Sequence, residues 1–546
     1  AYSWSPDGER VAFIAAEPEE DEDPVLPYAP EIYEENLTDR RLWTATLDGS
    51  EPRLMEVPGT VYQVEWSPVG DRIAVAVAPT ALVDDSYVNQ RIRVLDAETG
   101  AVVTRIENPG KLGPMGWSPS GQYLAYISAS SMNDPKEGRL MVADASTGAA
   151  FEVLTGYEGH VTSLVWEDDA VIRYTADRGV ETVLERVRRE AGAAPEALVP
   201  AGVAVFGDFS ASRDGSTLAF AASSPQHPSE LFVWTEGDDV PRRVTDTNPW
   251  LAEKRLAPQE VVEYEARDGL ALQGLLIRPL DGQAPAPTIV VVHGGPEAHY
   301  SNGWLTAYSL LGQLGAARGF AVFYPNYRGS TGRGVEFSMV SQGDPAGAEF
   351  DDIVDGVDHL IEMGVADADA VGVTGGSYGG YATGWLTTRY TDRFAAGVMF
   401  VGISNKISKF GTSDIPNELY LVHDRKWPWD DYQFALERSP IYWAEGMNTP
   451  LLIMHGAEDP RVHPAQSLEL YRALKLRGEA PVRLVLYPGE GHGNRSSTAR
   501  YDYTLRSLRW FEHFLMEGGE DLPPSDLDAL VEREQPEAMM GAAGSN

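Results

Sequence analysis

The chain has 546 residues, which at about 150 residues per domain is too long for a single small module. Hydrophobic residues make up 43% and charged residues 23% of the sequence, which is ordinary globular usage and excludes global disorder. The 82 Asp and Glu residues outnumber the 43 Lys and Arg residues, so the formal charge is -39. A surface this acidic repels phosphate backbones and anionic lipid headgroups, so we expect neither nucleic acid nor a membrane as a partner.

The chain contains no cysteine, which excludes disulfides, thiolate metal sites and cysteine nucleophiles. No stretch reaches the roughly 18 apolar residues that a membrane span needs. The sequence begins Ala1-Tyr2-Ser3-Trp4, without a Met or a hydrophobic leader, so we expect a signal peptide to be absent or already removed. The sequence does not determine the compartment, which is the cytoplasm or, if a leader was removed, the periplasm or the exterior.

The first half of the chain repeats one pattern, Trp-Ser-Pro-x-Gly followed by a short apolar run. Clear copies begin at Trp4, Trp66 and Trp117, and weaker copies lie at Trp166 and Phe209, at spacings of 62, 51, 49 and 43 residues. Pro presets the φ of a turn, Gly supplies positive φ, and the apolar run after it is typical of a strand. This period is that of four-stranded propeller blades, whereas a β-sandwich does not repeat at blade length.

We therefore predict a β-propeller over residues 1–255. At roughly 45 residues per blade the segment holds five or six blades. Because a propeller must close its ring and the first copy starts at the first residue, we expect one or two further blades upstream of residue 1.

The pattern changes near Trp250. A hairpin-like pair, 261–266 and 271–277, leads to a buried strand at 288–292. Short apolar runs then alternate with amphipathic segments, which predicts a parallel sheet covered by helices on both faces. The expected strands are 321–324, 370–374, 395–401, 450–454 and 482–487, and the expected helices are 348–363, 378–390, 464–475 and 500–516. We predict an α/β-hydrolase catalytic domain over residues 256–520 and an acidic, partly flexible tail over 521–546.

The strand at 370–374 ends in Gly375-Gly376-Ser377-Tyr378-Gly379, a G-x-S-x-G pattern between a predicted strand and a predicted helix. A nucleophile elbow needs this context, because the strained turn that exposes the Ser hydroxyl leaves no room for side chains beside it. The pattern indicates Ser377 as a nucleophile.

A Ser hydroxyl needs a His to accept its proton and a carboxylate to orient that His. In α/β-hydrolases the acid and the His follow the Ser in that order, at the ends of later strands. Asp459 and His492 fit this order after strands 450–454 and 482–487, so we assign Asp459 as the orienting acid and His492 as the general base. Glu458 is the alternative acid, one residue away.

A metal site is a competing interpretation, because His455, Asp459 and His463 are spaced four residues apart. That spacing places side chains on one face only within a continuous helix. Gly456, Pro460 and Pro464 prevent such a helix, so we expect no metal.

The tetrahedral intermediate needs amide donors for its oxyanion. Tyr378, directly after the nucleophile, supplies one. The turn His293-Gly294-Gly295-Pro296 after the first buried strand can supply another, and we choose Gly295, with Gly294 as the alternative.

These motifs together resemble the prolyl oligopeptidase family of serine peptidases, and most closely its acylaminoacyl-peptidase and dipeptidyl aminopeptidase branch. The resemblance covers residues 260–517 and, more loosely, the repeats before them. It is carried by His293 to Pro296, Asn326-Tyr327-Arg328-Gly329-Ser330-Thr331-Gly332, Gly375 to Tyr381, His455-Gly456 to Asp459, and Gly491-His492-Gly493. The resemblance implies a propeller over a hydrolase active site that admits short peptides, catalysis through an acyl-enzyme by Ser377, Asp459 and His492, and no cofactor.

The resemblance also suggests substrate contacts. Arg461 stands where family members hold a substrate carbonyl, although a surface salt bridge is an equally good interpretation. The pocket lacks the Trp and Tyr cluster of proline-specific relatives, and we assign it to Ile407, Phe410, Val462 and Tyr381. The acidic run at residues 17–23 could anchor a peptide's amino terminus, but a solvated loop is the stronger interpretation.

The sequence thus predicts a serine peptidase that hydrolyses short peptides, as an acylaminoacyl-peptidase or an aminopeptidase-like oligopeptidase. A carboxylesterase on the same fold is the alternative, because the same triad cleaves esters. A propeller binding module with a vestigial hydrolase is a weaker alternative. A homo-oligomer is compatible with the sequence, which does not determine the oligomeric state.

Overall fold

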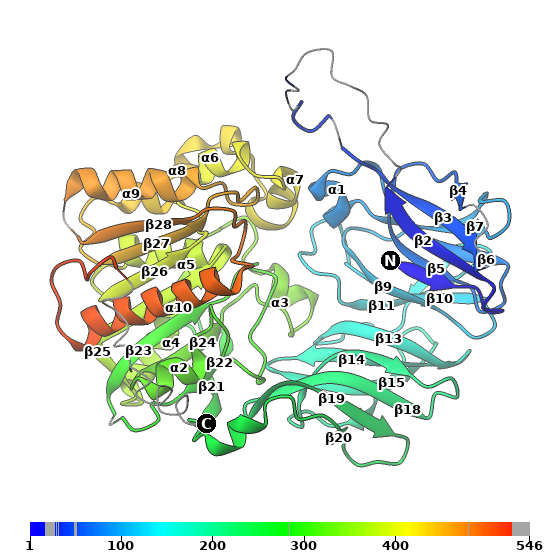
Figure 1. The fold of residues 1–546 in the computed structure, drawn as a ribbon, viewed down its shortest axis with the longest axis horizontal. Helices are drawn as coiled ribbons and strands as arrows, with labels where there is room; N and C mark the ends of the chain where they lie inside the picture. Colours follow the sequence, from blue (N-terminus) through cyan, green and yellow to red (C-terminus); the bar gives the residue numbers. More distant parts are fainter. Residues whose placement is uncertain are drawn as a thin grey trace, which may run out of the picture.

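The computed structural model describes residues 1–16, 28, 30, 32–35, 37–47, 52–282, 284–478 and 480–526. A β-sheet half and an α/β half lie side by side, with the β-sheet half on the right in Figure 1. The acidic run at residues 17–23 and most of the predicted tail lie outside the described residues.

The first half consists of five antiparallel sheets of four strands each within the described residues, and every sheet keeps its strands in sequence order. Adjacent sheets contact each other through their first strands, in the order β5, β9, β13 and β17. The predicted propeller fold is confirmed, with the lower of the two expected blade numbers. The strands are β1 (Tyr2–Trp4), β2 (Arg10–Ala16), β3 (Arg40–Thr46), β4 (Arg53–Met55), β5 (Thr60–Trp66), β6 (Arg72–Ala78), β7 (Arg91–Asp96), β8 (Val102–Ile106), β9 (Leu112–Trp117), β10 (Tyr123–Ser128), β11 (Arg139–Asp144), β12 (Ala150–Glu152), β13 (His160–Asp168), β14 (Val171–Arg178), β15 (Glu181–Arg188), β16 (Glu196–Val199), β17 (Val205–Ala211), β18 (Thr217–Ser224), β19 (His227–Thr235) and β20 (Arg242–Arg243).

The repeated Trp lies at the end of the first strand in a blade, before the turn to the second strand. Trp66 ends β5 and Trp117 ends β9, and Trp166 lies near the end of β13, the first strand of its own blade. The indole of Trp117 donates to the carbonyl of Glu65 (3.0 Å), and that of Trp166 donates to Gly116 (2.9 Å). Each acceptor belongs to the preceding blade, so these two Trp side chains hold consecutive blades together, whereas the Trp66 indole donates to Gly70 within its own blade.

The second half is built on one eight-stranded sheet of order β21-β22-β24-β23-β25-β26-β27-β28. Neighbours from β24 through β28 are parallel, whereas β21 and β22 form an antiparallel hairpin at one edge. The predicted parallel sheet is therefore extended by two antiparallel strands. The strands are β21 (Gln259–Glu265), β22 (Ala271–Ile277), β23 (Ala286–Val292), β24 (Ala321–Asn326), β25 (Ala366–Gly376), β26 (Ala396–Phe400), β27 (Leu451–Gly456) and β28 (Val482–Tyr487).

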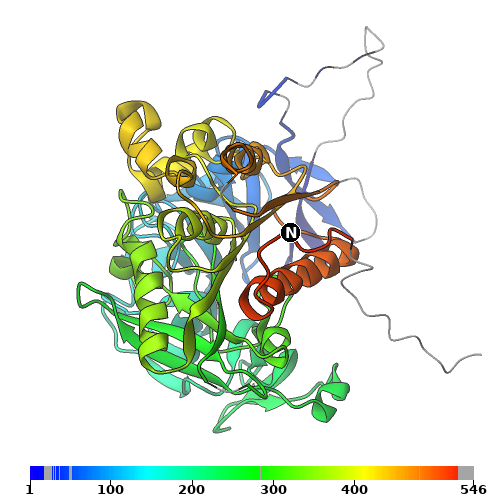
Figure 2. The same ribbon diagram turned by 90° about the vertical axis from the view of Figure 1, so that its left-hand side faces the viewer.

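Helices cover both faces of this sheet (Figure 2). On one face lie α4 (Ala348–Glu362), α5 (Tyr378–Arg389) and α9 (Ala465–Arg477), and on the other lie α2 (Gly312–Ala317) and α10 (Ser497–Phe511). Alternate side chains of each strand face opposite layers: Val373 packs with α4 and α5, whereas Leu452 packs with α10. The helix predicted at 500–516 begins three residues earlier and ends in a π-helical turn, η5 (Glu512–Met516).

Short helices stand between the main elements. They are α1 (Val83–Val88), η1 (Pro249–Glu253), α3 (Val335–Met339), α6 (Lys406–Gly411), α7 (Pro416–Glu418), η2 (Leu419–Asp424), η3 (Pro428–Asp430), α8 (Tyr432–Glu437) and η4 (Pro440–Trp443). Helix α1 of the propeller contacts α7 of the α/β half (Figure 1). The Asp84 carboxylate on α1 accepts the backbone N–H groups of Asn417 and Glu418, at 2.8 and 2.9 Å. An acidic side chain of the propeller thereby satisfies free donors of an α/β helix.

A second line of contacts joins the halves near β15. The Gly179 N–H donates to the Gly332 carbonyl (2.7 Å), and the Gly332 N–H donates to His160 Nδ1 (2.9 Å). The Asn302 amide donates to the Glu181 carboxylate at 2.9 Å. The two halves therefore meet through hydrogen bonds at two separate places.

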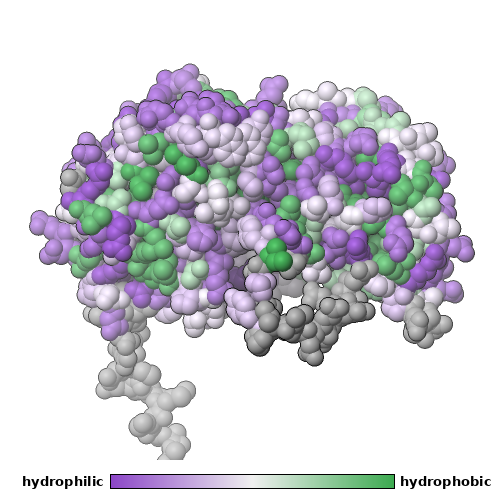
Figure 3. All heavy atoms as spheres, turned by 90° about the horizontal axis from the view of Figure 1, so that it is seen from above, coloured by the Kyte–Doolittle hydropathy of each residue, from purple (hydrophilic) through white to green (hydrophobic). Residues whose placement is uncertain are grey.

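On the surface seen in Figure 3, hydrophilic residues spread over both halves and hydrophobic residues form small separate groups. Among the described helices, none has both the length and the apolar character required to cross a bilayer.

Arg328, just after β24, forms a buried ion pair that ties this strand to α4. Its guanidinium donates to the wholly buried Asp352 at 2.7 and 2.8 Å and to Asp268 at 2.8 and 3.0 Å. We predict that Asp352→Ala lowers the free energy of unfolding by about 3 kcal/mol, because it leaves a buried charge with its main partner missing. Urea denaturation of the variant measures this loss.

The control is Asp281→Ala, which breaks the exposed pair between Asp281 and Arg255. An exposed pair contributes about 0 to 1 kcal/mol. Equal losses for the two variants would contradict a stabilising role for the buried pair.

Candidate active site

Ser377 occupies a sharp turn between β25 and α5. Its φ is 59° and its ψ is -118°, a conformation that is strained for a residue with a side chain. A Cβ atom at Gly375 would lie 2.5 Å from the Val292 carbonyl oxygen, and a Cβ at Gly379 would lie 2.1 Å from the same atom. Only glycine fits on either side of Ser377, as the sequence pattern predicts.

The three predicted catalytic side chains lie together in one chain of hydrogen bonds. His492 Nε2 is 2.9 Å from Ser377 Oγ, and His492 Nδ1 is 2.7 Å from Asp459 Oδ2. Ser377, Asp459 and His492 follow β25, β27 and β28 respectively. Because the carboxyl ends of parallel strands meet at one edge of a sheet, residues far apart in sequence converge there.

Asp459 is buried and held by several donors. The backbone N–H groups of Arg461 and Val462 donate to its Oδ1 at 2.9 and 3.0 Å, and His455 Nε2 lies 3.3 Å from its Oδ2. Burial raises the pKa of Asp459, but the hydrogen bonds from His455 and His492 and the Val462 amide outweigh burial, so the net pKa lies well below its usual range. An ionised Asp459 keeps the proton of His492 on Nδ1 and leaves Nε2 free to accept one. Glu458, the alternative acid, is exposed.

The predicted oxyanion donors flank Ser377. Tyr378 is the first residue of α5, so its N–H has no acceptor within the helix. A Cβ at Gly294 would lie 3.3 Å from the Ser377 Cβ and 3.8 Å from the Tyr378 nitrogen, and Gly295 follows with a φ of 116°. The turn therefore runs beside the nucleophile, while the choice between Gly295 and Gly294 as donor stays a prediction.

Arg461, which we expected to contact either a substrate carbonyl or a carboxylate, forms a salt bridge in the structure. Its guanidinium contacts the Asp414 carboxylate at 2.6 and 3.3 Å, and its Nη1 donates to the hydroxyl of Tyr87 at 2.9 Å. Tyr87 belongs to α1 of the propeller, so Arg461 joins the two halves two residues past Asp459.

The four residues assigned to the substrate pocket lie in different surroundings. Tyr381 is wholly buried in the core between Phe350 and Tyr378, and its hydroxyl donates to the Arg438 carbonyl. Val462 is buried beside Asp459, Ile407 is half-buried on α6, and Phe410 lines a small cavity of about 20 Å³. The structure places Tyr381 in the core rather than on the wall of this cavity, and the pocket roles stay predictions.

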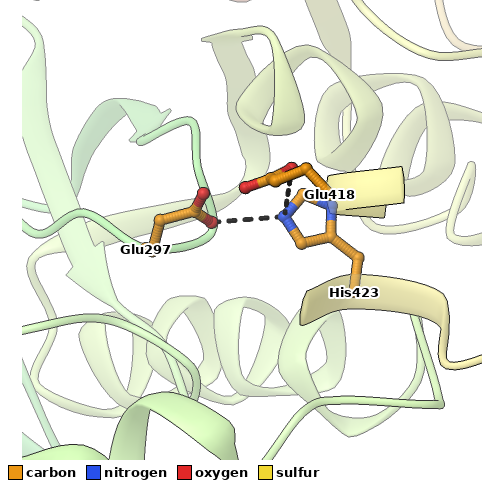
Figure 4. A group of neighbouring side chains, drawn as sticks. All are labelled: Glu297, Glu418 and His423. Atoms are coloured by element: carbon orange, nitrogen blue, oxygen red, sulfur yellow. Dashed lines mark hydrogen bonds and ion pairs between the residues drawn. The ribbon is translucent and has the colours of Figure 1, made fainter. Parts of the chain in front are cut away.

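The residues of the rejected metal site do not converge as three ligands. His455 contacts Asp459, but His463 is exposed and its ring accepts the N–H of Ala465. Within the described residues, one other group has suitable ligand atoms within 4.8 Å of one another, namely Glu297, Glu418 and His423 (Figure 4). Sequence analysis missed this group, and its only signal was the position of Glu297 directly after the turn at 293–296.

An ammonium group already lies against these carboxylates. Lys111 Nζ, from the propeller, is 2.8 Å from Glu418 Oε1 and 3.2 Å from Glu297 Oε1. The single positive charge of Lys111 thus lies between the two carboxylates.

Residues 306–517 match the model of the prolyl oligopeptidase family. An uncharacterized peptidase of Bacillus subtilis, YuxL, is 35% identical over 56% of this chain and 47% of its own length. Dipeptidyl aminopeptidase BIII of Pseudoxanthomonas mexicana is 36% identical over 51% of this chain and 42% of its own length. The chain thus spans less than half the length of these curated relatives.

A solved structure of the acylaminoacyl peptidase of Pyrococcus horikoshii matches with a TM-score of 0.68 at 20% identity, over 97% of this chain and 90% of that one. The fold and the hydrogen-bonded Ser, His and Asp define an α/β-hydrolase with an amino-terminal β-propeller. Within this class, residues 306–517 of the chain are similar to the prolyl oligopeptidase family.

Glu349, on α4, is buried behind the nucleophile turn. Its Oε1 accepts the Tyr378 hydroxyl at 2.6 Å and the Ala346 N–H at 2.8 Å, while its Oε2 has no hydrogen-bond partner. Burial raises the pKa of Glu349 to about 7, although these hydrogen bonds oppose the rise.

A carboxyl whose pKa is higher in the folded chain binds its proton more readily there, so its ionisation destabilises the fold as the pH rises from about 4.5 to 7. We predict that this ionisation lowers the free energy of unfolding of the wild type by about 3 kcal/mol, and that Glu349→Gln, which cannot ionise, does not show this decrease. The measurement is the urea midpoint at pH 5 and pH 8: wild type should lose more stability between them than the variant. An equal change of the urea midpoint between pH 5 and pH 8 in the wild type and the variant would contradict the prediction.

Proposed function

We propose that this chain forms a serine peptidase unit that hydrolyses short peptides through an acyl-enzyme. The observation that carries the proposal is the continuous hydrogen-bonded chain from Ser377 through His492 to Asp459 at a nucleophile elbow. The family match and the names of the related peptidases support the same reaction.

In this mechanism His492 Nε2 accepts the proton of Ser377 Oγ as that oxygen attacks the substrate carbonyl carbon. Asp459 stabilises the imidazolium that forms. The N–H groups of Tyr378 and Gly295, with Gly294 as the alternative, stabilise the oxyanion. His492 then protonates the leaving amine. In the second half of the reaction His492 accepts a proton from water as the water oxygen attacks the acyl-enzyme, and it returns that proton to Ser377 Oγ when the acyl group leaves.

The propeller supports a preference for short substrates. Tyr87 and Asp84 on α1 contact Arg461 and α7, so the propeller lies against the edge of the sheet that carries Ser377. We place the division between propeller and hydrolase near residue 255 and the end of the hydrolase near residue 520. A folded protein cannot enter between halves in contact, whereas a short peptide can.

The relatives that match include a dipeptidyl aminopeptidase and acylamino-acid-releasing enzymes. We therefore propose that the unit removes residues from the amino end of peptides, as an acylaminoacyl-peptidase or an aminopeptidase-like oligopeptidase. The carboxylesterase alternative is not favoured, because the family match and the named relatives are peptidases.

We predict that Ser377→Ala lowers turnover of a peptide anilide by at least about 10³-fold, because removal of the nucleophile leaves only binding and oxyanion stabilisation. Labelling by a fluorophosphonate should disappear in the same variant. Ser212→Ala, in an exposed propeller turn, is the matched control and should retain both. Labelling of another serine in the Ser377→Ala variant, together with retained activity, would disprove the assignment.

We predict a graded preference for hydrophobic residues before the scissile bond. Ile407, Phe410 and Val462 offer apolar side chains, and the rings of Trp427 and Phe434 line the cavity beside Phe410, so the expected absence of aromatic rings there is wrong. One or two methylenes in an apolar pocket change discrimination by only about 1 to 3 kcal/mol. Anilides ending in Leu, Phe, Ala and Pro should therefore differ modestly in kcat/KM. A preference of more than about 100-fold for proline, some 3 kcal/mol, would contradict the pocket assignment.

A further inference from the structure

Lys111 lies in the propeller just before β9, but its ammonium group lies among residues of the α/β half. Nζ contacts Glu418 Oε1 at 2.8 Å and Glu297 Oε1 at 3.2 Å, and the side chain is about 10% exposed. The Tyr87 ring of α1 lies beside it, with its centroid 5.8 Å from Nζ. One propeller cation thus bridges two elements of the other half.

The bridge is needed because the acids lie close together. Glu297 Oε2 is 3.3 Å from His423 Nε2, and Glu418 Oε2 is 3.9 Å from the same nitrogen (Figure 4). Two carboxylates in so small a buried volume repel each other unless a cation stands between them. Burial lowers the pKa of Lys111, but the charges of Glu297 and Glu418 outweigh burial, so the net pKa is raised and the ammonium form is held.

The cluster touches the residues that flank Ser377. Glu297 belongs to the turn that contains Gly295, the predicted oxyanion donor, and Gly294, its alternative. The His423 ring packs edge-on against the Tyr378 ring, with the centroids 5.5 Å apart. Glu418 is fixed by its N–H bond to Asp84 of α1. The position of the oxyanion turn is therefore connected through Glu297 to the docked propeller.

We propose that Lys111 is a positioning residue for the reaction proposed above: through Glu297 it holds the turn of residues 294–297 against Ser377, so that the oxyanion site forms when the propeller is docked. The alternative is that Lys111 contributes only to the stability of the interface. This inference rests on the proposed function. A separate measurement distinguishes a failure of the inference from a failure of the proposed function.

The test is Lys111→Met, which keeps an unbranched side chain one atom shorter than Lys and removes its charge. The two carboxylates then repel, and Glu297 draws the turn away from Ser377. A displacement of about 1 Å at a catalytic group can lower turnover by about 100-fold, so we expect kcat for a peptide anilide to fall by about 10- to 100-fold while KM changes by less than about 3-fold. An unchanged kcat would overturn the proposal.

Two further variants separate positioning from interface stability. Asn133→Ala removes the amide that donates to the Leu421 carbonyl across the same interface at 2.9 Å, without touching the oxyanion turn. It should leave kcat within about 2-fold of wild type. The double variant Lys111→Met with Glu418→Gln removes the repulsion and should recover most of the lost kcat. An equal loss of kcat in Asn133→Ala, or no recovery in the double variant, would assign Lys111 to the interface alone.

The rate of fluorophosphonate labelling at Ser377 tests this inference independently of the substrate, because labelling needs the nucleophile and the oxyanion site but no peptide. Labelling should be slower in Lys111→Met than in wild type and should recover in the double variant. Wild type that labels but cleaves no peptide would refute the proposed function alone. Equal labelling rates in wild type and in folded Lys111→Met, as judged by thermal melting, would refute the role of Lys111 alone.

Discussion

The backbone turn at Ser377 is the constraint on which the rest of the site depends. A φ of 59° is costly for serine, and it persists because β23, β25 and α5 approach so closely that side chains at Gly375 and Gly379 would overlap the Val292 carbonyl. This packing fixes where the Ser377 hydroxyl emerges. Asp459 and His492 can reach it because β27 and β28 end at the same edge of the sheet.

The edge that carries the site is also the place where the propeller docks. Arg461, close to Asp459, binds Tyr87 of α1, and Lys111 binds Glu297 beside the oxyanion turn. Both contacts pair a charged side chain of one half with a polar group of the other; the contact of Lys111 is partly buried and that of Arg461 is exposed. Such charge-assisted contacts need specific geometry, so they favour one arrangement of the two halves over other ways of docking them.

Much of the fold was predictable because its signals are local. The Trp-Ser-Pro-x-Gly turns indicated the propeller, and two of the repeated Trp side chains, Trp117 and Trp166, donate to the preceding blade. Regular apolar runs predicted β22 and β28 with their observed bounds. The short helices α6 to α8 were not predicted. Their few turns carry little periodicity. Helices α6 and α8 begin at the local N-caps Asn405 and Asp431, whereas the first N–H groups of α7 are bound by the distant Asp84.

The sequence by itself determined the two folds and the candidates Ser377, Asp459 and His492, because a strand, a tight turn and a helix leave a pattern within a few neighbouring residues. Only the tertiary structure decided which side chains meet across long separations. The cluster of Lys111, Glu297, Glu418 and His423 and the pairing of Arg461 with Asp414 and Tyr87 left no such pattern. The physical reason is that burial and charge act between residues that are close in space, and separation along the chain does not reveal that closeness.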